Sequence, residues 1–191
     1  MDYVYAAILG AVQGVAEFLP ISSSGHLVIA QALLSAMAAT ELPAWSKGAT
    51  MNVALHFGTL LSIAVVYFRD LLAALKTPRL LLLIVIASVP VGVIGVLFKD
   101  QIEASFENPM AAGCLLLVTA LFLFTAKRLQ SGRLAMDQIP AWVAIVIGIF
   151  QAIAILPGIS RAGSTIAAGL ICGLKRADAA MYLAKRAGKN R

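Results

Sequence analysis

Residues 12–29 read VQGVAEFLPISSSGHLVI, and this stretch decides how the chain is understood. A glutamate, three consecutive serines and a histidine stand there inside an otherwise apolar sequence. An acidic or basic side chain at the centre of a membrane helix costs about 2.5–3.5 kcal/mol on insertion scales, so such residues usually face a protein interior or a polar cavity. We therefore expect residues 12–29 to line a functional site.

A second stretch of the same kind, residues 149–170, reads IFQAIAILPGISRAGSTIAAGL. It contains Arg161, the one arginine that lies within an apolar stretch. Together the two stretches supply a carboxylate, an imidazole, a guanidinium and several hydroxyl groups. In a membrane protein this combination indicates chemistry on an anion.

The composition of the chain is that of an integral membrane protein. It is 61% hydrophobic and 13% charged, against about 25% charged for a typical soluble domain. Four apolar windows, at 49–68, 80–98, 109–126 and 139–157, are each near the roughly 20 residues that a spanning helix requires. The N-terminal residues lack the basic region of a cleaved signal peptide, so none is expected.

The net charge of +6 does not indicate nucleic-acid binding, because the basic residues lie in short loops between apolar runs and near the C-terminal end. Basic loops of membrane proteins face the cytoplasm. This rule places loops 69–79 and 127–138 in the cytoplasm, and loops 38–48 and 99–108 outside. The sequence gives no indication of the oligomeric state.

The two unusual stretches are copies of one another. A shift of 138 residues, which for example takes Gly25 to Gly163, aligns them without a gap. Three apolar windows separate them if each copy is re-entrant, and an odd number of spans inserts the second copy upside down. Inverted repeats with broken helices that meet around a site near the membrane midplane are a known architecture. The identical pairs include Gly10 and Gly148, Gln13 and Gln151, Ser22 and Ser160, and Gly25 and Gly163.

Each copy is interrupted by a turn rich in proline, serine and glycine, LPISSSG at 19–25 and LPGISRAG at 156–163. Backbone N–H groups that a broken helix frees cannot face lipid, so both turns should line a polar cavity. The helix that follows each turn begins with free N–H groups, which favour phosphate-like anions. The predicted fold is an all-α, polytopic membrane helical bundle with two re-entrant helical hairpins in inverted repeat.

These motifs resemble those of a known family. QGVAEFLPISSSGHL at 13–27 resembles the first signature of bacterial undecaprenyl-diphosphatases, which are membrane enzymes linked to bacitracin resistance, and LPGISRAGSTIAAGL at 156–170 resembles the second. The resemblance covers residues 1 to about 178. It implies a multi-pass protein of the bacterial inner membrane, with a polyprenyl diphosphate as its lipid substrate. The implied reaction hydrolyses undecaprenyl diphosphate to undecaprenyl phosphate and phosphate, which recycles the lipid carrier for cell-wall synthesis.

Four residues are candidates for catalysis. The planar guanidinium of Arg161 is suited to bidentate phosphate binding. Glu17 is a candidate base toward a hydroxyl group or water, and a candidate ligand for a divalent cation such as Mg²⁺ or Ca²⁺. His26 is a candidate proton donor and acceptor, and Ser23 a nucleophile activated by His26 or Glu17. Attack by serine, by histidine or by water stays open. The candidate substrate-binding residues are Gln13, Ser22, Ser24, Gly25, Ser160, Gly163 and Thr165.

The chain departs from the family pattern at several positions. Gln13 stands where family members often carry a glutamate, and an amide forms hydrogen bonds but is no base. Ala162 replaces a serine that is usual in the second motif. His56 lies outside both signatures, and we interpret it as a packed or helix-bridging residue.

The C-terminal end also differs from the family. We expect a membrane phosphatase domain over 1–178 that lacks the family's further C-terminal helices, followed by an atypical basic cytoplasmic tail over 179–191. The last residues, ADAAMYLAKRAGKNR, resemble the closing helix of diguanylate-cyclase (GGDEF) domains, without the cyclase motif. An inverted-repeat transporter or lipid flippase and an inactive truncated remnant remain as alternatives. A carrier needs no nucleophile or acid–base pair, so Glu17, Ser23 and His26 favour the enzyme.

Overall fold

The computed structural model describes residues 2–38, 48–128, 132, 134–135 and 138–175. The predicted tail at 179–191, with its cyclase-like end, and most of the predicted outer loop at 38–48 lie outside these residues. The described part is all-α apart from one isolated bridge between Leu134 and Leu174. Its helices are α1 (Asp2–Glu17), α2 (Ser23–Ala38), α3 (Gly48–Val66), α4 (Phe68–Leu75), α5 (Pro78–Leu97), α6 (Lys99–Ser105), α7 (Pro109–Arg128), α8 (Ala141–Ile153) and α9 (Arg161–Ile171).

Three of the four expected apolar windows coincide closely with helices, namely α3, α5 and α7. Pro78 and Pro109 are the first residues of α5 and α7, where a missing N–H costs no helical hydrogen bond. The expected window at 139–157 is wrong in length, because α8 ends at Ile153 and the chain turns before Pro157. The loops expected at 69–79 and 99–108 contain the short helices α4 and α6.

Two helices of the described part, α5 and α7, are long and apolar enough to cross a membrane. Each has 20 residues, or about 30 Å at 1.5 Å per residue, which equals the thickness of a typical hydrocarbon core. None of the large apolar side chains of α5 and α7 is buried, and many of them are exposed, as are most of those of α3. An apolar exterior of this extent is unusual in a soluble monomer and is what lipid contact requires. The chain is therefore an all-α membrane protein.

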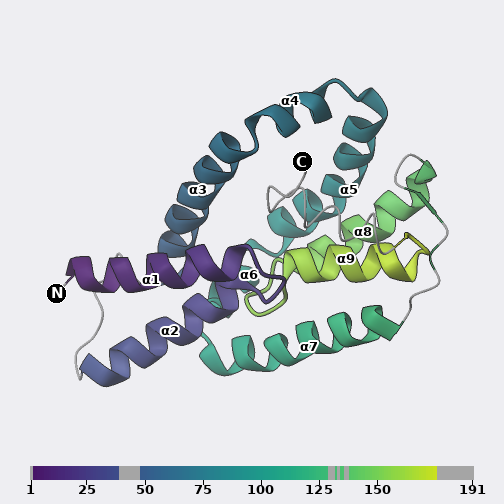
Figure 1. The fold of residues 1–191 in the computed structure, drawn as a ribbon. Helices are drawn as coiled ribbons and strands as arrows, with labels where there is room; N and C mark the ends of the chain where they lie inside the picture. The colour runs from purple at the N-terminus through teal and green to yellow at the C-terminus, as the bar shows by residue number, and fades with distance from the viewer. Residues whose placement is uncertain (1, 39–47, 129–131, 133, 136–137, 176–191) are drawn as a thin grey trace.

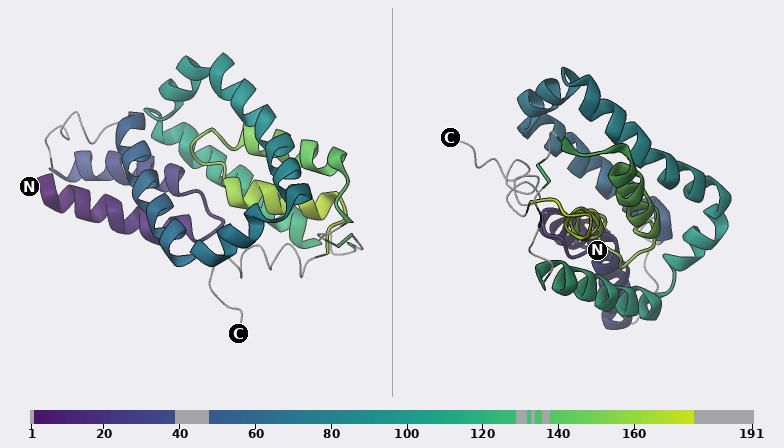
Figure 2. Two further views of the ribbon diagram at one scale, coloured as in Figure 1. Left: turned by 90° about the horizontal axis from the view of Figure 1, so that it is seen from above. Right: turned by 90° about the vertical axis from the view of Figure 1, so that its right-hand side faces the viewer.

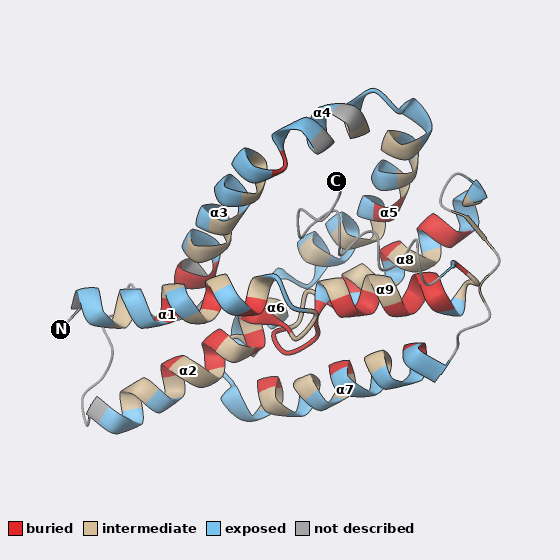
Figure 3. Cartoon of the chain, viewed as in Figure 1, coloured by how far each residue is buried: buried red, intermediate tan, exposed pale blue. Residues whose placement is uncertain are grey.

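The helices form two hairpins that meet end to end (Figure 1). One hairpin is α1 with α2, the other is α8 with α9, and α7 packs against both α2 and α9. The arm of α3, α4 and α5 rises from α1 and returns along α8 (Figures 1 and 2). Buried residues concentrate where the two hairpin turns meet and along α9 (Figure 3).

The two hairpin turns contact each other reciprocally. A Cβ atom at Gly25 would lie 2.6 Å from the Cα atom of Gly158, and a Cβ at Gly163 would lie 3.2 Å from the carbonyl oxygen of Pro20. The 138-residue shift maps Gly25 onto Gly163 and Pro20 onto Gly158. The same contact is thus made twice with the two copies exchanged, which is how elements related by a two-fold axis pack. The predicted repeat is therefore also a repeat of packing.

Candidate active site

The first turn is held in an uncommon conformation. Ser22 has a φ of +69°, a left-handed value that few residues other than glycine adopt. Its carbonyl oxygen accepts hydrogen bonds from the ring Nδ1 (2.7 Å) and the backbone N–H (3.2 Å) of His26. Its Oγ accepts from the backbone N–H of Gly25 at 3.4 Å, which is the bond of an N-cap. Ser22 and His26 therefore shape the start of α2.

The second turn is built in the same way and is joined to the first. Ser160 caps α9, because its Oγ accepts from the N–H of Gly163 at 3.0 Å. The N–H of Gly158 donates to Ser22 Oγ at 3.2 Å, which links the two turns. From α7, Thr119 Oγ1 donates to the Gly158 carbonyl at 2.7 Å and accepts from the Ser160 N–H at 2.9 Å.

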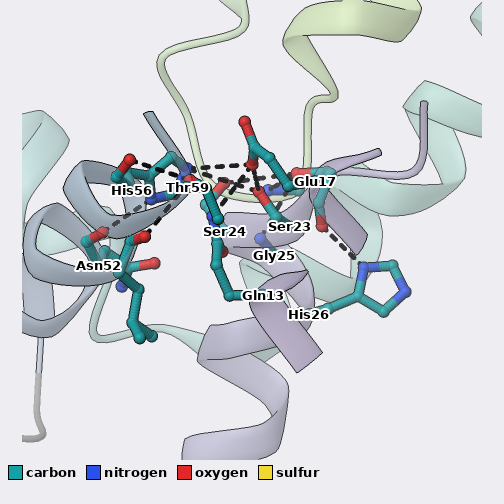
Figure 4. A network of polar contacts seen from close by, with 12 residues as sticks. Gln13, Glu17, Ser23, Ser24, Gly25, His26, Asn52, His56 and Thr59 are labelled. Atoms are coloured by element: carbon teal, nitrogen blue, oxygen red, sulfur yellow. Dashed lines mark hydrogen bonds and ion pairs between the residues drawn. The ribbon is translucent and has the colours of Figure 1, made fainter. Parts of the chain in front are cut away.

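One carboxylate oxygen, Oε2 of Glu17, is contacted from three helices (Figure 4). Ser23 Oγ of α2 donates to it at 2.5 Å, and Gln13 Nε2 of α1 donates at 3.0 Å. His56 Nε2 of α3 lies 3.6 Å from the same oxygen and 3.4 Å from Ser23 Oγ. A hydroxyl group, a carboxylate and an imidazole are thus gathered at the end of α1.

This group opens into a polar pocket between the two turns. Arg161, the first residue of α9, also lines this pocket and is exposed, and its side chain makes no hydrogen bond or ion pair with any described residue. A guanidinium at a capped helix N-terminus is a ready site for an anion. The predicted site residues that line the pocket are Glu17, Ser22, Ser23, Ser24, Ser160, Arg161 and Thr165.

Four predicted site residues do not line the pocket. Gln13 is buried behind Glu17, and its Oε1 has no hydrogen-bond partner among the described residues. Gly25 and Gly163 are buried where the turns pack together. His26 points away from the cluster of Glu17 and Ser23, toward the Ser22 carbonyl (Figure 4). The structure therefore does not bring His26 to Ser23.

Two polar residues of the pocket lining were missed by the sequence analysis, His56 and Gln151. A histidine within an apolar helix meets the same criterion that singled out Glu17, but His56 was set aside because it lies outside both motifs. It does bridge helices, as expected, and the bridge is part of the pocket. Gln151 corresponds to Gln13 in the repeat, and that correspondence was the available signal.

The chain is similar to known proteins over nearly its whole length. The family described as "Bacitracin resistance protein BacA" matches residues 6–183. An "Undecaprenyl-diphosphatase" of Methanosphaera stadtmanae is 38% identical over 206 residues, covering 95% of this chain and 71% of the relative. An "Undecaprenyl-diphosphatase" of Rhodopirellula baltica is 41% identical over 182 residues, covering 95% and 68%.

A third relative, "Undecaprenyl-diphosphatase 4" of Bacillus thuringiensis, is 40% identical over 184 residues, again covering 95% of this chain and 68% of the relative. The match includes both turns and all the helices that build the pocket. The chain therefore belongs to the bacitracin resistance protein BacA family, and its relatives carry the name of a hydrolase, undecaprenyl-diphosphatase.

Proposed function

We propose that this protein hydrolyses undecaprenyl diphosphate to undecaprenyl phosphate and inorganic phosphate in the pocket between the two turns. One observation carries the proposal: Ser23 Oγ donates to Glu17 Oε2 at 2.5 Å in a pocket that Arg161 also lines. A hydroxyl nucleophile, an adjacent base and a fixed cation are the groups that phosphoryl transfer requires.

Arg161 binds the terminal phosphate in this proposal. Its planar donors match two phosphate oxygens, and the N-terminal dipole of α9 adds to its charge. The hydroxyl group of Ser24, near the start of α2, lines the same pocket and is placed to donate to a remaining oxygen. Thr165 of α9 lines the pocket as well, and its hydroxyl group donates to the Ala162 carbonyl at 3.0 Å. Negative charge that develops on the transferred phosphoryl group is stabilised by the same donors.

Ser23 and Glu17 carry out the chemistry. The proton of Ser23 passes to Glu17 Oε2 while Ser23 Oγ bonds to the terminal phosphorus. The bond from that phosphorus to the bridging oxygen breaks, and undecaprenyl phosphate leaves with the electron pair and takes up the proton from Glu17, which returns Glu17 to its carboxylate form. Water then attacks the phosphoserine with Glu17 as the base, which releases phosphate and returns a proton to Ser23.

We also propose that a divalent cation, Mg²⁺ or Ca²⁺, assists. Such hard cations take oxygen ligands, and Mg²⁺ is often held by one or two carboxylates together with substrate phosphates. The pocket fits this pattern, because Glu17 supplies a carboxylate to its lining. Glu17 would hold the ion together with the substrate phosphates, and the ion would neutralise phosphate charge. Chelation should then abolish turnover and added Mg²⁺ should restore it.

The two hairpins are proposed to be re-entrant, within a multi-pass protein of the inner membrane. Helices α1, α8 and α9 have 16, 13 and 11 residues, or about 24, 20 and 17 Å at 1.5 Å per residue. Each is shorter than the roughly 30 Å hydrocarbon core. A turn inside the membrane lets the diphosphate reach the pocket while the polyprenyl chain stays in lipid.

The direct test is release of phosphate from undecaprenyl diphosphate by the purified protein. Wild-type protein should turn over, and Ser23→Ala and Arg161→Ala should each lose at least a hundredfold in kcat/KM. Radiolabelled terminal phosphate should be trapped on Ser23 after acid quenching. Absence of turnover in the wild type would overturn the proposal, and full turnover in Ser23→Ala would replace serine attack by direct attack of water.

A further inference from the structure

We propose that His56 of α3 is a positioning residue for this reaction, which holds Ser23 Oγ and Glu17 Oε2 together through its Nε2 atom. The proposal rests on the function proposed above. His56 lies outside both sequence motifs, and it comes from a helix that contributes no other side chain to the pocket lining among the described residues. Its case is made by three features of its hydrogen bonds.

First, the ring of His56 has a fixed orientation. Its Nδ1 lies 2.7 Å from the carbonyl oxygen of Asn52, one turn earlier in α3. A carbonyl oxygen only accepts, so Nδ1 carries a hydrogen and donates. This bond directs Nε2 away from α3, toward Ser23 Oγ and Glu17 Oε2 at 3.4 and 3.6 Å.

Second, the single hydroxyl proton of Ser23 is already committed. At 2.5 Å, Ser23 Oγ donates to Glu17 Oε2, because the carboxylate oxygen accepts. Ser23 Oγ can then only accept from His56, so Nε2 is the donor of the 3.4 Å contact. In this arrangement both ring nitrogens of His56 carry a hydrogen, as they do in an imidazolium. The same N–H faces Glu17 Oε2. His56 therefore contacts both members of the nucleophile–base pair at once.

Third, the other histidine gives an internal contrast. His26 is also anchored through Nδ1 at 2.7 Å to the carbonyl four residues earlier, that of Ser22. Its ring points away from the pair of Ser23 and Glu17, whereas the ring of His56 points to it (Figure 4). Equal anchoring with different directions identifies His56 as the histidine that serves the pair.

The position of His56 explains why a third helix is needed. Glu17 is the last residue of α1 and Ser23 the first of α2, so the turn between them sets their separation. His56, from α3, contacts both residues and adds a constraint that does not depend on this turn. A misplacement of about 1 Å costs on the order of a hundredfold in rate, so loss of the brace should lower kcat far more than it changes KM.

Three substitutions separate this role from simple packing. The terminal amide of glutamine reaches the position of Nε2, and that of asparagine reaches the position of Nδ1. His56→Gln should therefore keep kcat within about tenfold of the wild type, while His56→Asn and His56→Leu should lose about a hundredfold. KM for undecaprenyl diphosphate should change by less than about threefold in all three, and thermal unfolding in detergent checks that each variant folds.

Three results would overturn the inference. The first is rescue by asparagine instead of glutamine, which would make the bond to the Asn52 carbonyl the important one. The others are a normal kcat in His56→Leu, and equal losses of kcat in His56→Gln and His56→Leu. The double variant Ser23→Ala with His56→Leu should be no slower than Ser23→Ala alone, because His56 acts through Ser23. Failure of the underlying function is seen separately, as a wild-type protein without turnover in the same assay.

Discussion

Thr119 joins α7 to the turn that carries Arg161, and replacing it with valine should loosen that turn. Its side chain is 3% exposed, and its hydroxyl donates to the Gly158 carbonyl at 2.7 Å while accepting from the Ser160 N–H at 2.9 Å. Valine keeps the branched shape and removes the hydroxyl. Both backbone groups are buried, so each loses its partner in a place that water reaches poorly.

The expected cost follows from these two groups. A buried polar group left without a partner costs about 1–3 kcal/mol, so Thr119→Val should destabilise the protein by about 2–4 kcal/mol. That is a large part of a typical stability of about 5–15 kcal/mol. Because Arg161 directly follows Ser160, displacement of the turn should also lower kcat/KM by tenfold or more.

Thermal unfolding in detergent and phosphate release measure the two effects. Thr119→Ser should recover both properties, since serine retains the hydroxyl group. Thr125→Val is the matched control, because Thr125 lies on the exposed side of the same helix, and it should change neither. If Thr119→Val unfolds within about 0.5 kcal/mol of the wild type and turns over normally, the two bonds do not hold the turn.

Three further predictions concern packing, charge and topology. Gly25→Ala places a Cβ 2.6 Å from backbone of the second turn and should lower the unfolding temperature markedly, whereas Gly14→Ala, with nothing within 4 Å, should leave it unchanged. Arg161→Lys should lose nearly as much kcat/KM as the alanine variant, because an ammonium group does not reproduce the planar pair of donors; a lysine variant with most of the activity would show that charge alone suffices. For topology, Gln101→Cys and Gln138→Cys are made singly in a chain without its native cysteines. In intact cells an impermeant thiol reagent should label Gln101→Cys and not Gln138→Cys, and labelling of Gln138→Cys alone would show the opposite orientation.

The amino-acid sequence by itself determined the class of the protein and pointed to the two turns that line the candidate site. An apolar run of about twenty residues has few alternatives to a membrane helix, since every backbone polar group must be satisfied within the segment. Pro78 and Pro109 marked the starts of α5 and α7 for a local reason as well, because the first residue of a helix needs no N–H for the helical hydrogen bonds. The repeat at a shift of 138 residues could be recognised because both copies keep the same two residue types. Each copy has a serine that caps the following helix, Ser22 or Ser160, and a glycine where the two turns pack closely, Gly25 or Gly163.

The tertiary structure decided which side chains share the pocket. Local pattern favoured His26, which stands next to the three serines, yet its ring is turned to the Ser22 carbonyl. The contacts of His56 and Thr119 with the two motifs could not be predicted from the sequence. The sequence periodicity within α3 or α7 does not show which neighbouring helix each one packs against, or which of its faces is turned toward that neighbour. Packing of α3 on α1 brings His56 to Glu17, and packing of α7 beside α9 brings Thr119 to the second turn. In both contacts, His56 with Glu17 and Gly158 with Thr119, the two residues are 39 positions apart in the sequence. Such contacts depend on how whole helices pack together, which no local stretch of sequence encodes.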